Sequence, residues 1–161
     1  MKNLVIVFVV LCFCFMGYLI KQKYKNQKEF LMEVKDFLEY FKANMSVLNN
    51  SVVEIINSYK IIQNNKNAKC FNLFQNNENL VKFNAKTLEK YIYNENLAVI
   101  LKNYFEDFGS KTHDFELEKL NNVLGFLGDS IQKTEEEIKS KGDIWFKILI
   151  AIGLVFAIVL W

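Results

Sequence analysis

Residues Leu4–Ile20 read LVIVFVVLCFCFMGYLI, and residues Ile148–Trp161 read ILIAIGLVFAIVLW. The first stretch contains no charged residue, and the second continues an apolar run that begins at Ile144 and is interrupted only by Lys147. A helix that spans a bilayer needs roughly 17–25 apolar residues, and both stretches reach the lower end of that range. We therefore expect a transmembrane helix near each end of the chain.

These two segments divide the sequence into three parts. We expect an N-terminal transmembrane helix at 1–20, a cytoplasmic helical bundle at 21–143 and a C-terminal transmembrane helix at 144–161. The middle part has the length of one ordinary domain and carries enough apolar residues to form a core. The predicted fold class is all-α, an antiparallel helical bundle between two transmembrane helices.

A cleaved signal peptide is the alternative for the first segment, because Lys2 precedes an apolar stretch. That stretch is longer than the usual apolar region of a signal peptide, and Gly17–Ile20 lacks the small residues of a cleavage site. Cys12 and Cys14 do not indicate a lipoprotein, because large apolar residues precede both. A retained membrane anchor is the favoured interpretation.

Lysines near the inner ends of both segments predict the orientation. Cytoplasmic flanks of membrane helices carry an excess of lysine and arginine, which places the middle domain in the cytoplasm and makes this a two-pass membrane protein. Trp145 and Lys147 suit an interfacial position, where aromatic rings and long cationic side chains are stable. The flanking lysines are Lys21, Lys23, Lys25, Lys28, Lys139, Lys141 and Lys147.

The composition excludes several classes of protein. The formal net charge is only +2, and all 20 basic residues are lysines, so the arginines that usually read bases and phosphates are missing. Nucleic-acid binding is therefore not expected. Cys12 and Cys14 lie in the first apolar segment and Cys70 lies in the middle part, and the three form neither a disulfide framework nor a zinc site.

The absence of proline and the helical spacing of apolar residues predict long helices. The first helix is expected to continue from the membrane segment through Phe30, Val34, Phe37, Phe41 and Met45. Ser46 or Ser51 is expected to cap a second helix that ends near Ile62. The remaining expected features are a polar joint at 63–69, an apolar stretch at 70–74, an Asn-rich joint at 75–79, a third helix at 80–92 and a fourth at 97–108.

The last long helix is expected to start after Gly109, a residue type that often ends a preceding helix. Ser110 or Thr112 would cap it, and its apolar stripe extends from Phe115 to Ile138. The helix is expected to run through Lys141, Gly142 and Asp143 into the second apolar segment. The first and last helices of the bundle are therefore expected to run directly into the membrane.

No catalytic constellation is expected. His113 is the only histidine, and together with Ser110 and Asp114 it is better explained as part of a helix start than as a catalytic triad. The two glycines of Gly125–Gly128 lack the spacing of a phosphate-binding loop. The sequence predicts no cofactor, no metal site and no enzymatic activity; a membrane enzyme would need a polar cluster at membrane depth.

An acidic run, Glu135, Glu136 and Glu137, is the candidate partner surface. Three nearby lysines can pair with it along the helix, and such runs are most often solvated helix faces. The sequence leaves both interpretations open.

The order of these elements and the last third of the chain resemble the stage III sporulation protein AB family of endospore-forming bacteria. Phe108 and Gly109 match a Leu-Gly pair of that family. Thr112 stands where the family usually has Asp, and Glu116 where it usually has Gln. Gly153 matches a glycine of the final apolar segment, whereas Phe105 and Leu149 replace two other glycines of the family pattern.

The resemblance implies a structural role in endospore formation. The bundle of this family looks like the cytoplasmic domains of the F-component platform of type II secretion systems. The chain would then be a platform subunit in the mother-cell membrane that docks a secretion-type sporulation ATPase and other channel subunits. The alternative is a self-associating membrane scaffold of the cell envelope or the division machinery; whether the chain forms a homo-oligomer stays open.

Overall fold

A computed structural model describes residues 2–48, 51–62, 69–77, 80–108 and 113–160. It divides into two compact units. Unit 1 combines Met1–Lys28 with Gln132–Trp161, and unit 2 comprises Glu29–Ile131. The sequence-based borders at residues 20 and 143 follow the loss of apolar character, whereas the borders at residues 28 and 132 follow packing and lie further from the two chain ends.

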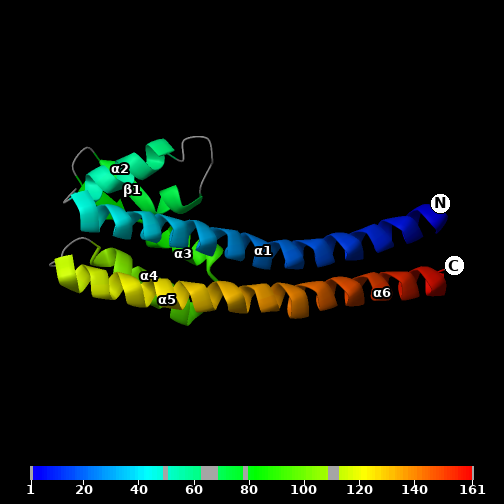
Figure 1. The fold of residues 1–161 in the computed structure, drawn as a ribbon. Helices are drawn as coiled ribbons and strands as arrows, with labels where there is room; N and C mark the ends of the chain where they lie inside the picture. Colours follow the sequence, from blue (N-terminus) through cyan, green and yellow to red (C-terminus); the bar gives the residue numbers. More distant parts are fainter. Residues whose placement is uncertain (1, 49–50, 63–68, 78–79, 109–112, 161) are drawn as a thin grey trace. The chain divides into compact units, whose positions relative to one another are not determined.

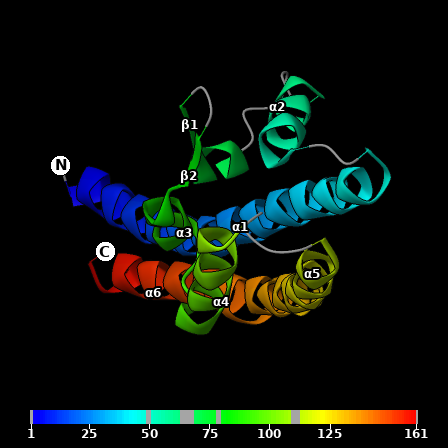
Figure 2. The same ribbon diagram turned by 90° about the vertical axis from the view of Figure 1, so that its left-hand side faces the viewer.

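Unit 1 is an antiparallel pair of helices from the two ends of the chain (Figures 1 and 2). Its first member is the beginning of α1 (Lys2–Leu48), and its second consists of the end of α5 (His113–Glu137), the π-helical turn η2 (Ile138–Gly142) and α6 (Asp143–Leu160). The chain therefore stays helical from His113 to Leu160. This agrees with the prediction that the last bundle helix continues into the second apolar segment.

Two helical stretches, Ile6–Met45 and Asp114–Val159, are long and apolar enough to cross a membrane. In the most apolar window of each, only 6% and 17% of the residues are buried. A core helix of a soluble protein would have most of this surface covered. The apolar side chains of α6 and of the first half of α1 thus lie mainly on the outside of the pair.

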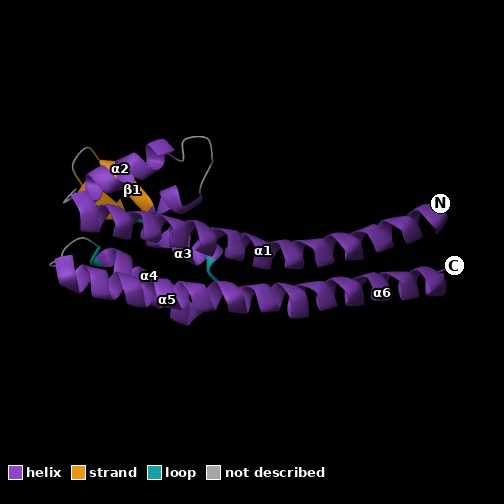
Figure 3. Ribbon diagram, viewed as in Figure 1, coloured by secondary structure: helices purple, strands orange, loops and turns teal. Residues whose placement is uncertain are grey.

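Unit 2 surrounds its parts of α1 and α5 with short elements. They are α2 (Val52–Ile62), the 3₁₀ helix η1 (Lys69–Leu73), the strands β1 (Phe74–Asn77) and β2 (Leu80–Phe83), α3 (Ala85–Tyr91) and α4 (Glu95–Glu106). Helices dominate, so the all-α prediction is confirmed. The two strands form one antiparallel hairpin, in which Phe74 pairs with Phe83 and Asn77 with Leu80 (Figure 3).

The hairpin corrects the predicted third helix. The sequence predicts helix over 80–92, but Leu80–Phe83 is a strand and the helix begins only at Ala85. The N–H of Asn84 donates to the carbonyl of Leu73 at 2.8 Å, which anchors the strand exit to the end of η1. Because tertiary pairing decides the conformation of such short apolar runs, periodicity alone could not assign it.

Local side-chain bonds fix two helix starts. Ser51 and Glu54 form a capping box at α2: Ser51 Oγ accepts from the Glu54 N–H at 3.3 Å, and the Ser51 N–H donates to Glu54 Oε2 at 2.9 Å. Of the two caps proposed for this helix, Ser51 is therefore confirmed. Asn94 caps α4 by accepting from the Leu97 N–H at 3.2 Å.

The core of unit 2 is rich in aromatic rings. Phe37 of α1 lies at its centre, with ring centroids 5.3 Å from Tyr59, 5.2 Å from Phe74 and 6.2 Å from Phe108. The predicted stripe on α1 is confirmed, because its members from Phe30 to Phe41 are buried. Aliphatic side chains of α4 and α5 complete the core, including Leu97, Leu101, Leu120 and Leu127.

Candidate functional site

A ladder of polar pairs joins the two helices of unit 1. Lys21 Nζ lies 2.8 Å from an Asp143 carboxylate oxygen, and Lys28 Nζ lies 3.1 Å from Glu135 Oε2. Gln27 Nε2 donates to Thr134 Oγ1 at 3.3 Å, and both of these side chains are buried. The residues of each pair meet because the helices run antiparallel, so the ladder fixes their register.

Glycines continue this contact beyond the ladder. A β-carbon on Gly17 would lie 2.9 Å from Phe146 Cδ2, and one on Gly153 would lie 3.2 Å from Phe13 Cβ. The rings of Phe13 and Phe156 stack at a centroid distance of 5.7 Å. Small residues at such positions let helix backbones approach closely, which is a common way for membrane helices to associate.

The ion pairs shift the protonation equilibria of their carboxylates. Hydrogen bonds from Lys28 and then Lys139 lower the pKa of Glu135. A hydrogen bond from Lys21 lowers the pKa of Asp143. Both carboxylates are solvent-exposed, and each therefore stays ionised to more acidic pH than it would alone.

The acidic run is largely engaged within the chain. Glu135 pairs with Lys28 and also with Lys139 at 3.2 Å, and Glu137 pairs with Lys141 at 2.7 Å. The Glu136 side chain is exposed. Of the three residues of the candidate partner surface, Glu136 is therefore the one that offers an exposed carboxylate without breaking one of these pairs.

The predicted interfacial residues differ in their environments. Lys21 and Lys28 take part in the ladder, whereas Lys23 and Lys25 are exposed on α1. Trp145 is 51% exposed, and Lys147, two positions further along α6, is exposed as well. The structure does not gather these residues into one cluster.

The residues that match the family pattern lie in both units. In unit 2, the Phe108 ring packs at a tilt against Phe41, with a centroid distance of 4.4 Å. Glu116 is only 2% exposed and lies beside the phenol of Tyr104, whose pKa is raised by burial and by the Glu116 charge. Gly153 makes the close contact of unit 1 already described. Gly109 and Thr112 lie outside the described residues, as does Ser110.

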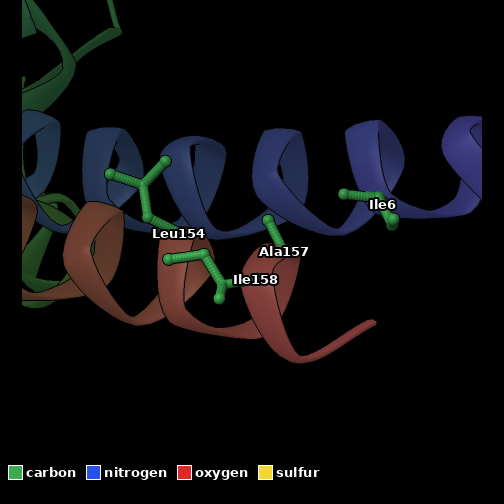
Figure 4. Close-up of a pocket in the computed structure, with 4 residues that line it drawn as sticks. All are labelled: Ile6, Leu154, Ala157 and Ile158. Carbon is green, nitrogen blue, oxygen red and sulfur yellow. The ribbon is translucent and has the colours of Figure 1, made fainter. Parts of the chain in front are cut away.

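Within the described part of the chain, no group of three or more His, Cys, Asp and Glu residues could hold a metal ion. An apolar groove in unit 1 is lined by Ile6, Leu154, Ala157 and Ile158 (Figure 4). All four lining side chains are aliphatic, so the groove brings no acid, base or nucleophile together. The described geometry is that of a packing surface.

Sequence reasoning missed the partners in the ladder. Asp143, Gln27 and Thr134 were not singled out, and neither was the contact of Gly17 with the opposite helix. The sequence does contain a signal, because Lys21 and Lys28 follow the first apolar segment at about the same distances at which Asp143 and Glu135 precede the second. These charges predict ion pairs only if the two apolar segments are known to pack against each other.

These features define a class: a mainly helical protein with two helices able to cross a membrane, paired through an antiparallel polar and glycine contact. The family model of stage III sporulation protein AB matches residues 2–161. The chain belongs to the stage III sporulation protein AB family. No curated protein and no solved structure shows significant similarity to it.

Proposed function

We propose that this chain is a non-enzymatic platform subunit of a secretion-like channel needed for endospore formation. In this role it docks a cytoplasmic secretion-type ATPase and joins other channel subunits in the membrane. The observation that carries the proposal is the ladder of unit 1, with Lys21–Asp143 and Lys28–Glu135, at the inner ends of the two apolar segments. A paired set of helices with exposed apolar surface suits a subunit that contacts several partners in a membrane.

The proposed location is the mother-cell membrane, with both apolar segments inserted and the middle of the chain in the cytoplasm. The excess of lysine beside both inner ends supports this orientation. The exposed aliphatic and aromatic side chains of α6, such as Leu154, Val155 and Val159, support insertion into lipid. The groove of Figure 4 adds further apolar surface for lipid chains.

The orientation is tested by labelling cells with a membrane-impermeant maleimide. Cys12 and Cys14 are replaced by Ala, and Ser58→Cys introduces an exposed thiol on α2. We expect this thiol to react only after lysis. Asn3→Cys is the matched probe for the other side and should react in intact cells; the reverse pattern would refute the orientation.

Glu136 is the proposed contact for the ATPase, because its carboxylate is exposed whereas Glu135 and Glu137 form ion pairs. The test is co-purification of the secretion-type sporulation ATPase from detergent extracts. We expect Glu136→Lys to reduce the recovered ATPase severalfold. Glu118→Lys, a charge reversal at an exposed position of the same helix, should leave the recovery unchanged.

Deletion of the gene tests the wider proposal. A strain without this chain should form few heat-resistant spores, and the full chain supplied in trans should restore them. Normal spore formation in the deletion strain would contradict the proposed role. Recovery of the chain without the ATPase, from cells in which both are present, would contradict the docking function alone.

A further inference from the structure

The π-helical turn η2 lies within the second helix of unit 1. Five residues, Ile138–Gly142, form a wider turn between α5 and α6, and the Asp143 N–H donates to the Ile138 carbonyl five residues earlier. Turns of this kind are rare and are usually single turns within α-helices, often at functional sites. The extra residue in such a turn changes the face that the following helix presents.

The contacts of unit 1 show that the face of this helix turned toward α1 changes at η2. Beyond the turn, Asp143 pairs with Lys21, and the other residues of this helix that contact α1 include Gly142, Phe146, Leu149, Gly153 and Phe156. Their spacings of four, three, four and three residues are those of a regular helix contact. Before the turn, the buried contact residue is Thr134, eight positions ahead of Gly142.

In an uninterrupted α-helix, Thr134 and the contact residues from Gly142 to Phe156 would not lie on the same face. Counting from Thr134 in alternating steps of four and three gives Ile138, Lys141, Trp145, Ile148, Ile152 and Val155 as the contact positions. From Lys141 onward, each lies one residue before a position in the observed set. Trp145, Ile148, Ile152 and Val155 are 51%, 41%, 37% and 60% exposed, whereas in the observed set Gly142 and Gly153 are buried and Phe156 is 48% exposed.

Side chains of the turn bond back to residues four positions earlier in the same helix. Ser140 Oγ donates to the Glu136 carbonyl at 2.6 Å, a bond to a backbone acceptor from one turn earlier. Lys139 pairs with Glu135 and Lys141 with Glu137, so both exposed lysines of the turn are tied back to α5. These local bonds do not depend on which face α6 presents to α1.

We propose that η2 is a switch of helix register that gives α6 two faces toward α1. In the described state, the π-turn directs the set containing Gly142, Phe146 and Gly153 onto α1. In the second state the turn becomes α-helical, and α6 rotates by about 100°, the angle of one residue. The set containing Trp145, Ile148 and Ile152 then faces α1, and the Gly17 contact is released.

Deletion of one residue from η2 distinguishes a turn that changes between two conformations from a turn with one fixed conformation. Without Ser140, the turn can become α-helical while all later residues keep their observed orientation. The ΔSer140 chain should therefore retain the described contacts and lose the second state. The full chain is used in native membranes, with Cys12 and Cys14 replaced by Ala.

Two disulfides report the two states under mild oxidation. Phe13→Cys with Gly153→Cys reports the described state, because the β-carbons at these positions lie about as close as a disulfide requires. Phe13→Cys with Ile152→Cys reports the rotated state. We expect the full-length chain to form both disulfides, and ΔSer140 to form the 13–153 disulfide at an unchanged rate and the 13–152 disulfide severalfold more slowly.

Insertion of one Ala directly after Ala151 is the matched control, since it adds one residue to regular α6 and places Ile152 in the position that Gly153 holds in the native chain. It should exchange the pattern, favouring 13–152 over 13–153. This exchange verifies that the assay reports rotation. Equal rates of 13–152 formation in the full-length chain and in ΔSer140 would overturn the proposal, and so would loss of the 13–153 disulfide in ΔSer140.

Discussion

Gly17 of α1 lies directly against Phe146 of α6. A β-carbon at Gly17 would stand 2.9 Å from Phe146 Cδ2 and 3.2 Å from its Cα, closer than side chains and backbone normally allow. The two backbones approach here because one of them carries no side chain. This contact turns two apolar helices into a defined pair.

Gly17→Leu should therefore disrupt the pair. Four added carbon atoms cannot fit against the Phe146 backbone, so the helices must separate or slide. We expect the Phe13→Cys/Gly153→Cys disulfide to form severalfold more slowly in membranes that carry Gly17→Leu. An unchanged rate would show that the Gly17 contact does not control the pairing.

Gly125→Ala is a glycine replacement with the opposite expected result. Nothing lies within 4 Å of a β-carbon at Gly125 on α5, so an added methyl group meets no obstacle. Alanine in a helix interior is favoured over glycine by about 0.5–1 kcal/mol. Urea unfolding of the purified chain should show an increase in the free energy of unfolding of this size; a decrease would reveal a packing role for Gly125.

The ion-pair ladder predicts an acid-dependent loss of stability in unit 1. The pKa of Glu135 is lowered in the folded chain by Lys28 and Lys139, so its contribution is fully present above the unfolded value of roughly 4.3. The contribution is lost as the pH falls through the folded pKa. Asp143 behaves in the same way beside Lys21.

The measurement is the thermal midpoint between pH 7 and pH 3, with Lys28→Gln as the comparison. The native chain should lose more thermal stability over this interval than the variant, because the variant lacks the strongest partner of Glu135. Lys25→Gln, at an exposed position of α1, controls for the change in net charge. Identical slopes in all three chains would rule out a contribution from this pair.

Cys70 should be unreactive in the native chain. Burial raises the pKa of this thiol to about 12, with a further increase from the charges of Glu33 and Asp36. Since the thiolate is the reactive form, a maleimide at pH 8 should label Cys70 only after unfolding. The raised pKa also means that the stability linked to Cys70 is complete below roughly 8.5 and declines as the pH rises toward the folded value.

Glu33→Gln should make this thiol easier to label. Glu33 Oε2 accepts a hydrogen bond from the Cys70 N–H at 3.0 Å, at the start of η1. A hydrogen bond to a charged acceptor contributes more than one to a neutral acceptor, and its loss should cost about 1 kcal/mol. Labelling in the Cys12→Ala, Cys14→Ala background should become about fivefold faster if η1 opens locally.

Phe108→Ala should destabilise unit 2 more than an equivalent change on its surface. The Phe108 ring packs at a centroid distance of 4.4 Å from Phe41 and 5.5 Å from Tyr104. Truncating a core phenylalanine costs about 3–5 kcal/mol, and this half-buried ring should lie near the lower limit. Phe115→Ala, where the ring is 49% exposed, is the control and should cost less than half as much in urea unfolding.

The long helices could be predicted from the sequence because their signals are long. The stripe through Phe30, Val34 and Phe37 repeats with the helical period, and no proline interrupts it. The cap at Ser51 could also be proposed from the sequence, because its hydrogen bonds with Glu54 join residues three positions apart. Such features depend on neighbours in sequence, so no knowledge of the tertiary fold was required.

The hairpin and the ladder depend on pairing between separate segments of the chain. Phe83 reads equally well as part of a helix or a strand, and its pairing with Phe74 decides between them. Lys28 and Glu135 are separated by 107 positions, and only the antiparallel pairing of the chain ends brings them together. The family resemblance pointed to residues such as Phe108, Glu116 and Gly153 but did not predict which residues they contact. Gly109 and Thr112 stay predictions.

The distance along the chain between Lys28 and Glu135 also has a consequence for biosynthesis. At about 5–20 residues per second, a ribosome needs roughly 5–20 seconds to make the 107 positions between them. By the end of that interval α1 is complete, whereas Phe146 and Leu149, which cover Gly17, have not yet been made. The nascent chain must therefore pass through a stage in which the Gly17 face of α1 is uncovered, and other proteins can contact this face before the chain's own second helix does.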